Sequence, residues 1–84
     1  MNNFDTLKKK ILYRSNHRGV KELDLLLSNF VKKYIDSFDE VELKELDSLL
    51  NVDDEILYKW YFNLDTKTLV TKNKVTKKLK EFKL

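Results

Sequence analysis

The sequence predicts a small all-α domain of five helices packed as a bundle. The 84 residues include no Pro and only one Gly, the two residue types that most disfavour a helix interior. Apolar residues recur three and four positions apart along most of the chain, which is the period of a helix with one buried face. No segment alternates as a half-buried strand does, and no Asn-Gly or Asp-Gly pair marks a hairpin. At this length we expect residues 1–84 to form one domain.

The first two helices are expected on either side of a polar turn. The first covers residues 3–13, and residues 14–19 then interrupt the apolar pattern and end in the lone glycine. The apolar face of the first helix holds Phe4, Leu7, Ile11 and Leu12. The second helix is the clearest, with a stripe of Leu23, Leu26, Leu27, Phe30, Val31, Tyr34, Ile35 and Phe38. A stripe this regular predicts a core face and not a cofactor site.

Capping residues mark the starts of the third and fourth helices. Asp39 can cap the third helix, and Glu42 three positions later completes a capping box. Asn51 is expected to end that helix, and Asp53 or Asp54 to begin the next. The buried faces are predicted to be Leu43, Leu46, Leu49 and Leu50 on the third helix, and Ile56, Leu57, Trp60, Tyr61 and Leu64 on the fourth.

The fifth helix is expected over residues 69–82, after a loop at residues 65–68. Val75, Leu79 and Phe82 fall on its inward face, and lysines on its outward face. The connections between the five predicted helices are short, as they are in compact helical domains.

The composition excludes several classes of enzyme. The chain has no Cys, which excludes disulfides, thiolate zinc sites, iron–sulfur clusters and cysteine nucleophiles. A single Gly excludes glycine-rich phosphate loops. The single His, His17, has no neighbouring carboxylate or nucleophile that would make it a catalytic base, and we expect it to be an exposed loop residue. Catalytic residues, a metal site and enzyme activity are therefore not expected.

No signal peptide or membrane-spanning segment is visible in the sequence. The longest apolar run is Leu25-Leu26-Leu27, whereas about 20 apolar residues are needed to cross a bilayer. No apolar stretch follows Lys8-Lys9-Lys10, as it would in a secretory signal. These observations predict a cytoplasmic protein of a bacterial form, without membrane insertion.

The charges are unevenly distributed along the chain. The net charge is +3, but residues 1–22 and 65–84 are basic and residues 23–64 are acidic. Basic ends leave open an alternative function, a small nucleic-acid-binding domain. The last 20 residues contain seven Lys, no Arg and one aromatic residue, a composition more typical of a solvated helix face than of a base-reading surface.

The candidate site is the segment that contains Arg14, Arg18, Gly19 and Glu22. Glycine is disfavoured inside a helix, and its presence at position 19 is explained by a positive φ at the turn or by room for close approach of a partner's backbone. Arg18 lies one helical turn before Glu22, and the two can pair if Arg18 belongs to the helix. The alternative is purely structural, namely a helix start with a surface ion pair of about 0–1 kcal/mol.

Residues 13–30, Tyr-Arg-Ser-Asn-His-Arg-Gly-Val-Lys-Glu-Leu-Asp-Leu-Leu-Leu-Ser-Asn-Phe, resemble the signature of the small succinate dehydrogenase assembly factors. Members of this family are also called FAD assembly factors or flavinators, and Arg-Gly-x-x-Glu followed by Leu-Asp is their hallmark. The downstream Leu49-Leu50, Asp54 and Trp60 resemble the family's later pattern. The family's length and five-helix fold agree with the fold predicted above.

The resemblance implies a function that the residue pattern alone does not give. Family members bind the flavoprotein subunit of succinate dehydrogenase, and in bacteria often that of fumarate reductase, and promote covalent attachment of FAD to a His of that subunit. The residues that would form the partner-binding face are Arg18, Gly19 and Glu22, with Tyr13, Arg14 and Asp54 as neighbours. FAD would be the partner's cofactor and not stably bound by this chain, which is expected to be a monomer.

Overall fold

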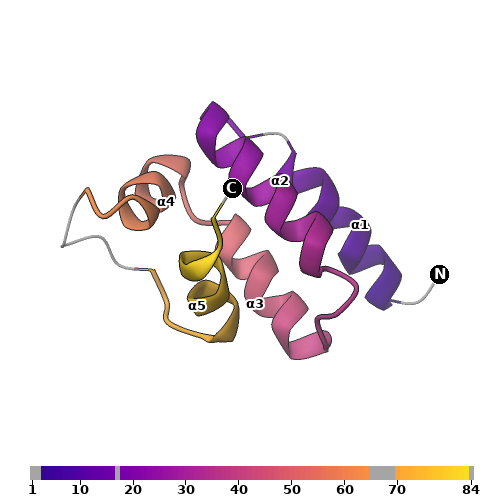
Figure 1. Ribbon diagram of the computed structural model, residues 1–84. Helices are drawn as coiled ribbons and strands as arrows, with labels where there is room; N and C mark the ends of the chain where they lie inside the picture. The colour runs from indigo at the N-terminus through magenta and orange to yellow at the C-terminus, as the bar shows by residue number, and fades with distance from the viewer. Residues whose placement is uncertain (1–2, 17, 65–69, 84) are drawn as a thin grey trace.

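The computed structural model describes residues 3–16, 18–64 and 70–83, and within them it contains five α-helices and no strand (Figure 1). The predicted all-α fold class is therefore confirmed. The helices are α1 Asn3–Ser15, α2 Lys21–Tyr34, α3 Glu40–Leu50, α4 Asp54–Tyr61 and α5 Lys74–Glu81. None of these helices has the length and apolar composition that crossing a bilayer requires.

The helices pack around α2 and α3. Figure 1 shows α1 and α2 side by side and running in opposite directions, and α3 packs against α1. Helix α5 packs against α3, and α4 lies at the edge of the molecule against α2. This leaves a surface between the start of α2 and α4 on which the candidate site lies.

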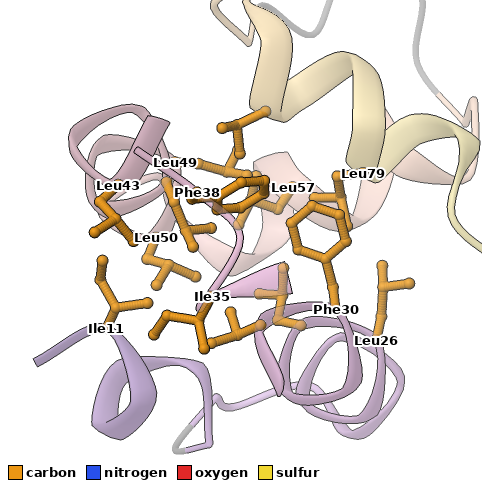
Figure 2. Close-up of a cluster of buried hydrophobic side chains, with 14 of the residues drawn as sticks. Ile11, Leu26, Phe30, Ile35, Phe38, Leu43, Leu49, Leu50, Leu57 and Leu79 are labelled. Carbon is orange, nitrogen blue, oxygen red and sulfur yellow. The ribbon is translucent and has the colours of Figure 1, made fainter. Parts of the chain in front are cut away.

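The core draws residues from all five helices (Figure 2). Phe30 of α2 is fully buried, and its ring lies 5.1 to 6.1 Å from those of Tyr34, Phe38 and Phe82. The buried hydrophobic residues are Ile11, Leu23, Leu26, Leu27, Phe30, Val31, Ile35, Phe38, Leu43, Leu46, Leu49, Leu50, Leu57, Val75 and Leu79. The stripe predicted for the second helix is thus confirmed as core, although α2 ends at Tyr34, so that Ile35 and Phe38 belong to the turn that follows.

Side-chain caps set the helix starts as predicted at two places. Asp39 accepts a hydrogen bond from the Glu42 N–H at 2.8 Å, and Glu42 accepts one from the Asp39 N–H at 3.2 Å. Asp53 caps α4 by accepting from the Glu55 N–H at 2.9 Å. A further capping box, which we did not predict, joins Asn73 and Thr76 and starts α5 at Lys74.

Three predictions about the ends of the helices need correction. Helix α1 continues to Ser15, whose hydroxyl donates to the Leu12 carbonyl at 2.9 Å. Ile56 and Leu64, predicted to be buried, are 42% and 63% exposed. Helix α4 ends at Tyr61 and Asn63 has a φ of 57°, so the helical period no longer places Leu64 on the buried face. The predicted loop at residues 65–68 lies outside the described residues, as does residue 69. Residues 70–73, predicted to belong to the fifth helix, are not helical, because the Asn73 cap starts α5 at Lys74.

Candidate functional site

Arg18 holds together three parts of the chain. Its Nη1 donates to the Leu50 carbonyl at 2.8 Å, its Nη2 donates to the Val52 carbonyl at 3.2 Å, and its guanidinium forms an ion pair with Asp54. The side chain is only 10% exposed. A cation at the C-terminal end of α3 and a carboxylate in the first turn of α4 both complement the helix dipoles. Arg18 therefore fixes the segment before α2 to the α3–α4 connection.

Gly19 shares the same carboxylate. Its N–H donates to Asp54 Oδ2 at 2.9 Å, so Asp54 bridges the Arg18 guanidinium and the Gly19 backbone. The φ of Gly19 is not positive, which removes conformational freedom as the reason for a glycine here. A Cβ at this position would lie 3.4 Å from Asp54 Oδ2, at the near limit of ordinary contact. Because Gly19 has no side chain, its backbone is exposed beside the Asp54 carboxylate.

Glu22 lies in the first turn of α2 and is exposed. The condition for a pair between Arg18 and Glu22 is not met, because Arg18 precedes the helix, whose N-cap is Val20. The Arg18 guanidinium is directed to the α3–α4 connection instead. Within the part of the chain that the structure describes, no hydrogen bond or ion pair engages the Glu22 carboxylate. Its charge is therefore available at the surface.

Two adjoining hollows meet at Glu22. We call the first the acidic hollow; it is lined by Gly19, Val20, Glu22, Asp53, Asp54, Glu55 and Tyr58. We call the second the apolar hollow; it is lined by Glu22, Leu25, Leu26, Tyr61, Phe62, Asn63 and Lys83. Both run between α2 and α4.

The other predicted site residues lie elsewhere on α1. Arg14 Nη1 pairs with Asp47 Oδ1 of α3 at 3.2 Å, and Lys10 Nζ reaches the other oxygen of Asp47 at 3.5 Å. Tyr13 is exposed near the end of α1. The structure thus gathers Arg18, Gly19, Glu22 and Asp54 around the acidic hollow and gives Arg14 a separate partner. His17 lies outside the described residues.

A brace from the C-terminal segment, formed by Lys80 and Phe82, holds the other end of α4. Lys80 Nζ donates to the carbonyls of Trp60 and Tyr61, and the Tyr61 hydroxyl donates to the Phe82 carbonyl. Burial raises the pKa of Tyr61; burial, and then the nearby charge of Lys83, lower the pKa of Lys80. Sequence reasoning missed this brace and the carbonyl partners of Arg18, since a backbone acceptor leaves no mark in a residue pattern.

The arrangement of the described residues is suited to binding. Among the described residues no group of His, Asp and Glu side chains is placed to hold a metal ion. What the site offers is an uncompensated carboxylate, a bare glycine backbone and two hollows on a segment that Arg18 fixes in place.

Comparison with known proteins gives consistent matches. A family described as the flavinator of succinate dehydrogenase matches residues 9–83. Mitochondrial succinate dehydrogenase assembly factor 2 of Saccharomyces cerevisiae is 43% identical over 82 residues, which cover 93% of this chain and 51% of that protein. The Scheffersomyces stipitis protein of the same name is 45% identical over 74 residues, 87% of this chain and 50% of that protein. Mitochondrial succinate dehydrogenase assembly factor 2-A of Drosophila mojavensis is 44% identical over 61 residues, which cover 70% of this chain and 39% of that protein.

These matches bear on the earlier expectations. The chain spans about half the length of the yeast proteins that it matches. The predicted cytoplasmic location is wrong, because these relatives carry mitochondrial names. A lack of long apolar runs excludes a membrane span from such a segment, but it does not distinguish one aqueous compartment from another. The alternative of nucleic-acid binding receives no support from these matches.

Proposed function

We propose that this chain, which belongs to the family of flavinators of succinate dehydrogenase, binds the flavoprotein subunit of succinate dehydrogenase and promotes covalent attachment of FAD to it. The names of the matching relatives support an assembly role. The fumarate reductase flavoprotein is a second client that we propose to test in the same way.

The observation that carries the proposal is the acidic hollow at the family motif. Gly19 contributes a bare backbone and Glu22 an exposed carboxylate without a partner among the described residues. A carboxylate that accepts hydrogen bonds from a charged donor across an interface binds more strongly than a neutral acceptor. In this proposal Glu22 and Gly19 contact the flavoprotein, while Arg18 and Asp54 hold the contacting segment in place.

The proposed factor performs no step of the chemistry itself. The chain contains no Cys, and its described residues include no group of acidic or His side chains that could hold a metal ion. FAD and the acceptor His belong to the flavoprotein, and we propose that docking holds that subunit in a conformation in which the two are aligned. Alignment of reacting groups contributes several kcal/mol to lowering a barrier. We propose that the chain acts as a monomer and binds no FAD stably.

Reconstitution of the flavoprotein subunit tests this function. The apo-subunit is incubated with FAD, with and without the chain, and covalent flavin is measured by in-gel fluorescence after denaturation. We expect the chain to increase covalent flavin, and Gly19→Arg or Glu22→Ala to reduce that increase at least tenfold. Glu40→Ala is the matched control, because Glu40 is an exposed acidic residue in the first turn of α3 and lies outside both hollows.

Two results would contradict the proposal. If the chain failed to increase covalent flavin on either flavoprotein, the function would be wrong. If Gly19→Arg and Glu22→Ala supported as much covalent flavin as Glu40→Ala, the acidic hollow would not be the binding site. Thermal unfolding of each variant separates loss of binding from loss of fold.

A further inference from the structure

We infer that the surface between α2 and α4 binds a segment of the flavoprotein that presents a basic side chain next to an apolar one. The basic group enters the acidic hollow and the apolar side chain enters the apolar hollow, with Glu22 between them. This inference rests on the proposed function, and it specifies the chemistry and the direction of the bound segment.

Charge selects the occupant of the acidic hollow. Four of its seven lining residues are Glu or Asp, and none is Lys or Arg. Two of these carboxylates have internal cations, since Asp54 pairs with Arg18, and Glu55 pairs with Lys59 at 3.0 Å. Asp53 accepts a backbone N–H of α4. Glu22 has no such partner in the described part of the chain, so its carboxylate is free to accept hydrogen bonds from an arriving cation.

The exposed apolar side chains that line the apolar hollow favour an apolar occupant. Leu25 is 49% exposed and Phe62 is 41% exposed, and fully buried Leu26 lies beside them. The hollow has a volume of about 560 Å³, which accommodates a large side chain. Burial of an aliphatic or aromatic side chain there removes apolar surface of both partners from water. Such a buried centre with a polar edge is the usual arrangement of an interface.

Lys83 sets the direction of the bound segment. It lines the apolar hollow and its Nζ lies 5.6 Å from the centre of the Tyr61 ring. A basic side chain in that hollow would face Lys83 as a like charge, whereas the charged residues that line the acidic hollow are all Asp or Glu. The apolar side chain of the segment therefore enters on the Lys83 side and the basic one on the Asp53 side.

Variants of the two hollows test the inference separately. The dissociation constant for the purified flavoprotein subunit is measured at 50 and 300 mM salt by titration calorimetry. We expect Leu25→Ser and Phe62→Ser each to weaken binding about tenfold at both salt concentrations. Glu22→Gln is expected to weaken binding about tenfold at 50 mM salt and less at 300 mM, because screening reduces the lost attraction. Phe62→Leu keeps the apolar bulk and is expected to bind within threefold of the wild-type chain.

Val41→Ser is the matched control, because Val41 is 65% exposed on α3 and lines neither hollow; we expect it to bind as the wild-type chain does. The Phe62 ring contacts those of Tyr58 and Tyr61, so the melting temperature of Phe62→Ser is measured as well. Leu25→Ser tests the same hollow independently of those ring contacts.

The outcomes distinguish this inference from the proposed function. If Leu25→Ser and Phe62→Ser bound normally while Gly19→Arg did not, the apolar hollow would be unoccupied and the inference would be overturned, with the proposed function intact. If Glu22→Gln bound the subunit with the same salt dependence as the wild-type chain, the proposal that a basic side chain enters the acidic hollow would be overturned. If the wild-type chain did not bind the subunit, the proposed function itself would fail. Light scattering of the free chain would overturn the choice of partner if it showed a dimer that Phe62→Ser dissociates.

Discussion

At the scale of single residues, the two charged side chains of the Arg-Gly-x-x-Glu motif have different environments. Arg18 is nearly buried, and its guanidinium donates hydrogen bonds to two carbonyls and forms an ion pair with Asp54. Glu22, four positions later, is exposed and unpaired within the described residues. Spacing alone suggested a surface pair between them, but the donors of Arg18 are taken by residues more than 30 positions away in the sequence.

Arg18→Ala tests the structural importance of this residue. Removing the guanidinium leaves two carbonyls without their donor and Asp54 without its cation, and we expect a loss of about 2–4 kcal/mol in the free energy of unfolding. Arg18→Lys should recover only part of that, because an ammonium cannot reproduce the fork of donors. Urea unfolding measures both variants. Arg14→Ala is the control; its ion pair with Asp47 is more exposed, and its removal should cost about 0–1 kcal/mol. Equal losses for Arg18→Ala and Arg14→Ala would contradict the assignment.

At the scale of elements, α4 is a short helix held at both ends. Asp54 ties its start to Arg18 and Gly19. Its end is bound by Lys80 of α5, which donates to the Tyr61 carbonyl, and by Phe82, whose carbonyl accepts from the Tyr61 hydroxyl. Of its residues only Leu57 is buried. Tyr58, Trp60 and Tyr61 are partly buried against the core. The position of α4, and with it the geometry of both hollows, therefore depends on the polar contacts at its ends as well as on this apolar packing.

The pH dependence of stability tests the brace at Tyr61. Burial raises the pKa of Tyr61, so the folded chain keeps the phenol protonated at a pH at which the unfolded chain loses the proton. The hydrogen bond from Tyr61 to the Phe82 carbonyl should contribute about 0.5–1.5 kcal/mol below the ordinary tyrosine pKa of about 10, and this contribution is lost as the pH rises through the higher folded value. Urea unfolding at pH 8 and pH 11 should show the wild-type chain losing its advantage over Tyr61→Phe. A constant difference between the two chains would mean that the phenol contributes no proton-dependent stability.

The sequence predicted elements better than it predicted contacts. Asp39 with Glu42, and the apolar stripe of α2, are local patterns, and both are confirmed. The exposure of Ile56 and Leu64 depends on where α4 ends and on how little of it the other helices cover. The structure brings Gly19 and Glu22 of the motif to the same hollow. The acceptors of Arg18 could not be predicted, because they are backbone carbonyls, which any residue type supplies.

At the scale of the whole molecule, burial joins the five helices into one core. Ile11, Phe30, Leu43, Leu57 and Leu79 come one from each helix and lie in a single buried cluster (Figure 2). Each helix buries its apolar face only by packing against the other helices. A core shared in this way predicts that the helices unfold together, as small single domains usually do.

Coincident unfolding transitions test the prediction that residues 1–84 form one domain. Trp60, the only tryptophan, lies at α4 with the Lys80 Nζ 4.8 Å from its ring centre, so its fluorescence reports on the edge of the molecule. Circular dichroism reports on all five helices. At about 0.05–0.15 kcal/mol per residue, the free energy of unfolding should be roughly 4–13 kcal/mol, and both signals should give the same midpoint and slope in urea. If the fluorescence transition came first, α4 and the brace would form a separate unit, and both hollows would open before the core does.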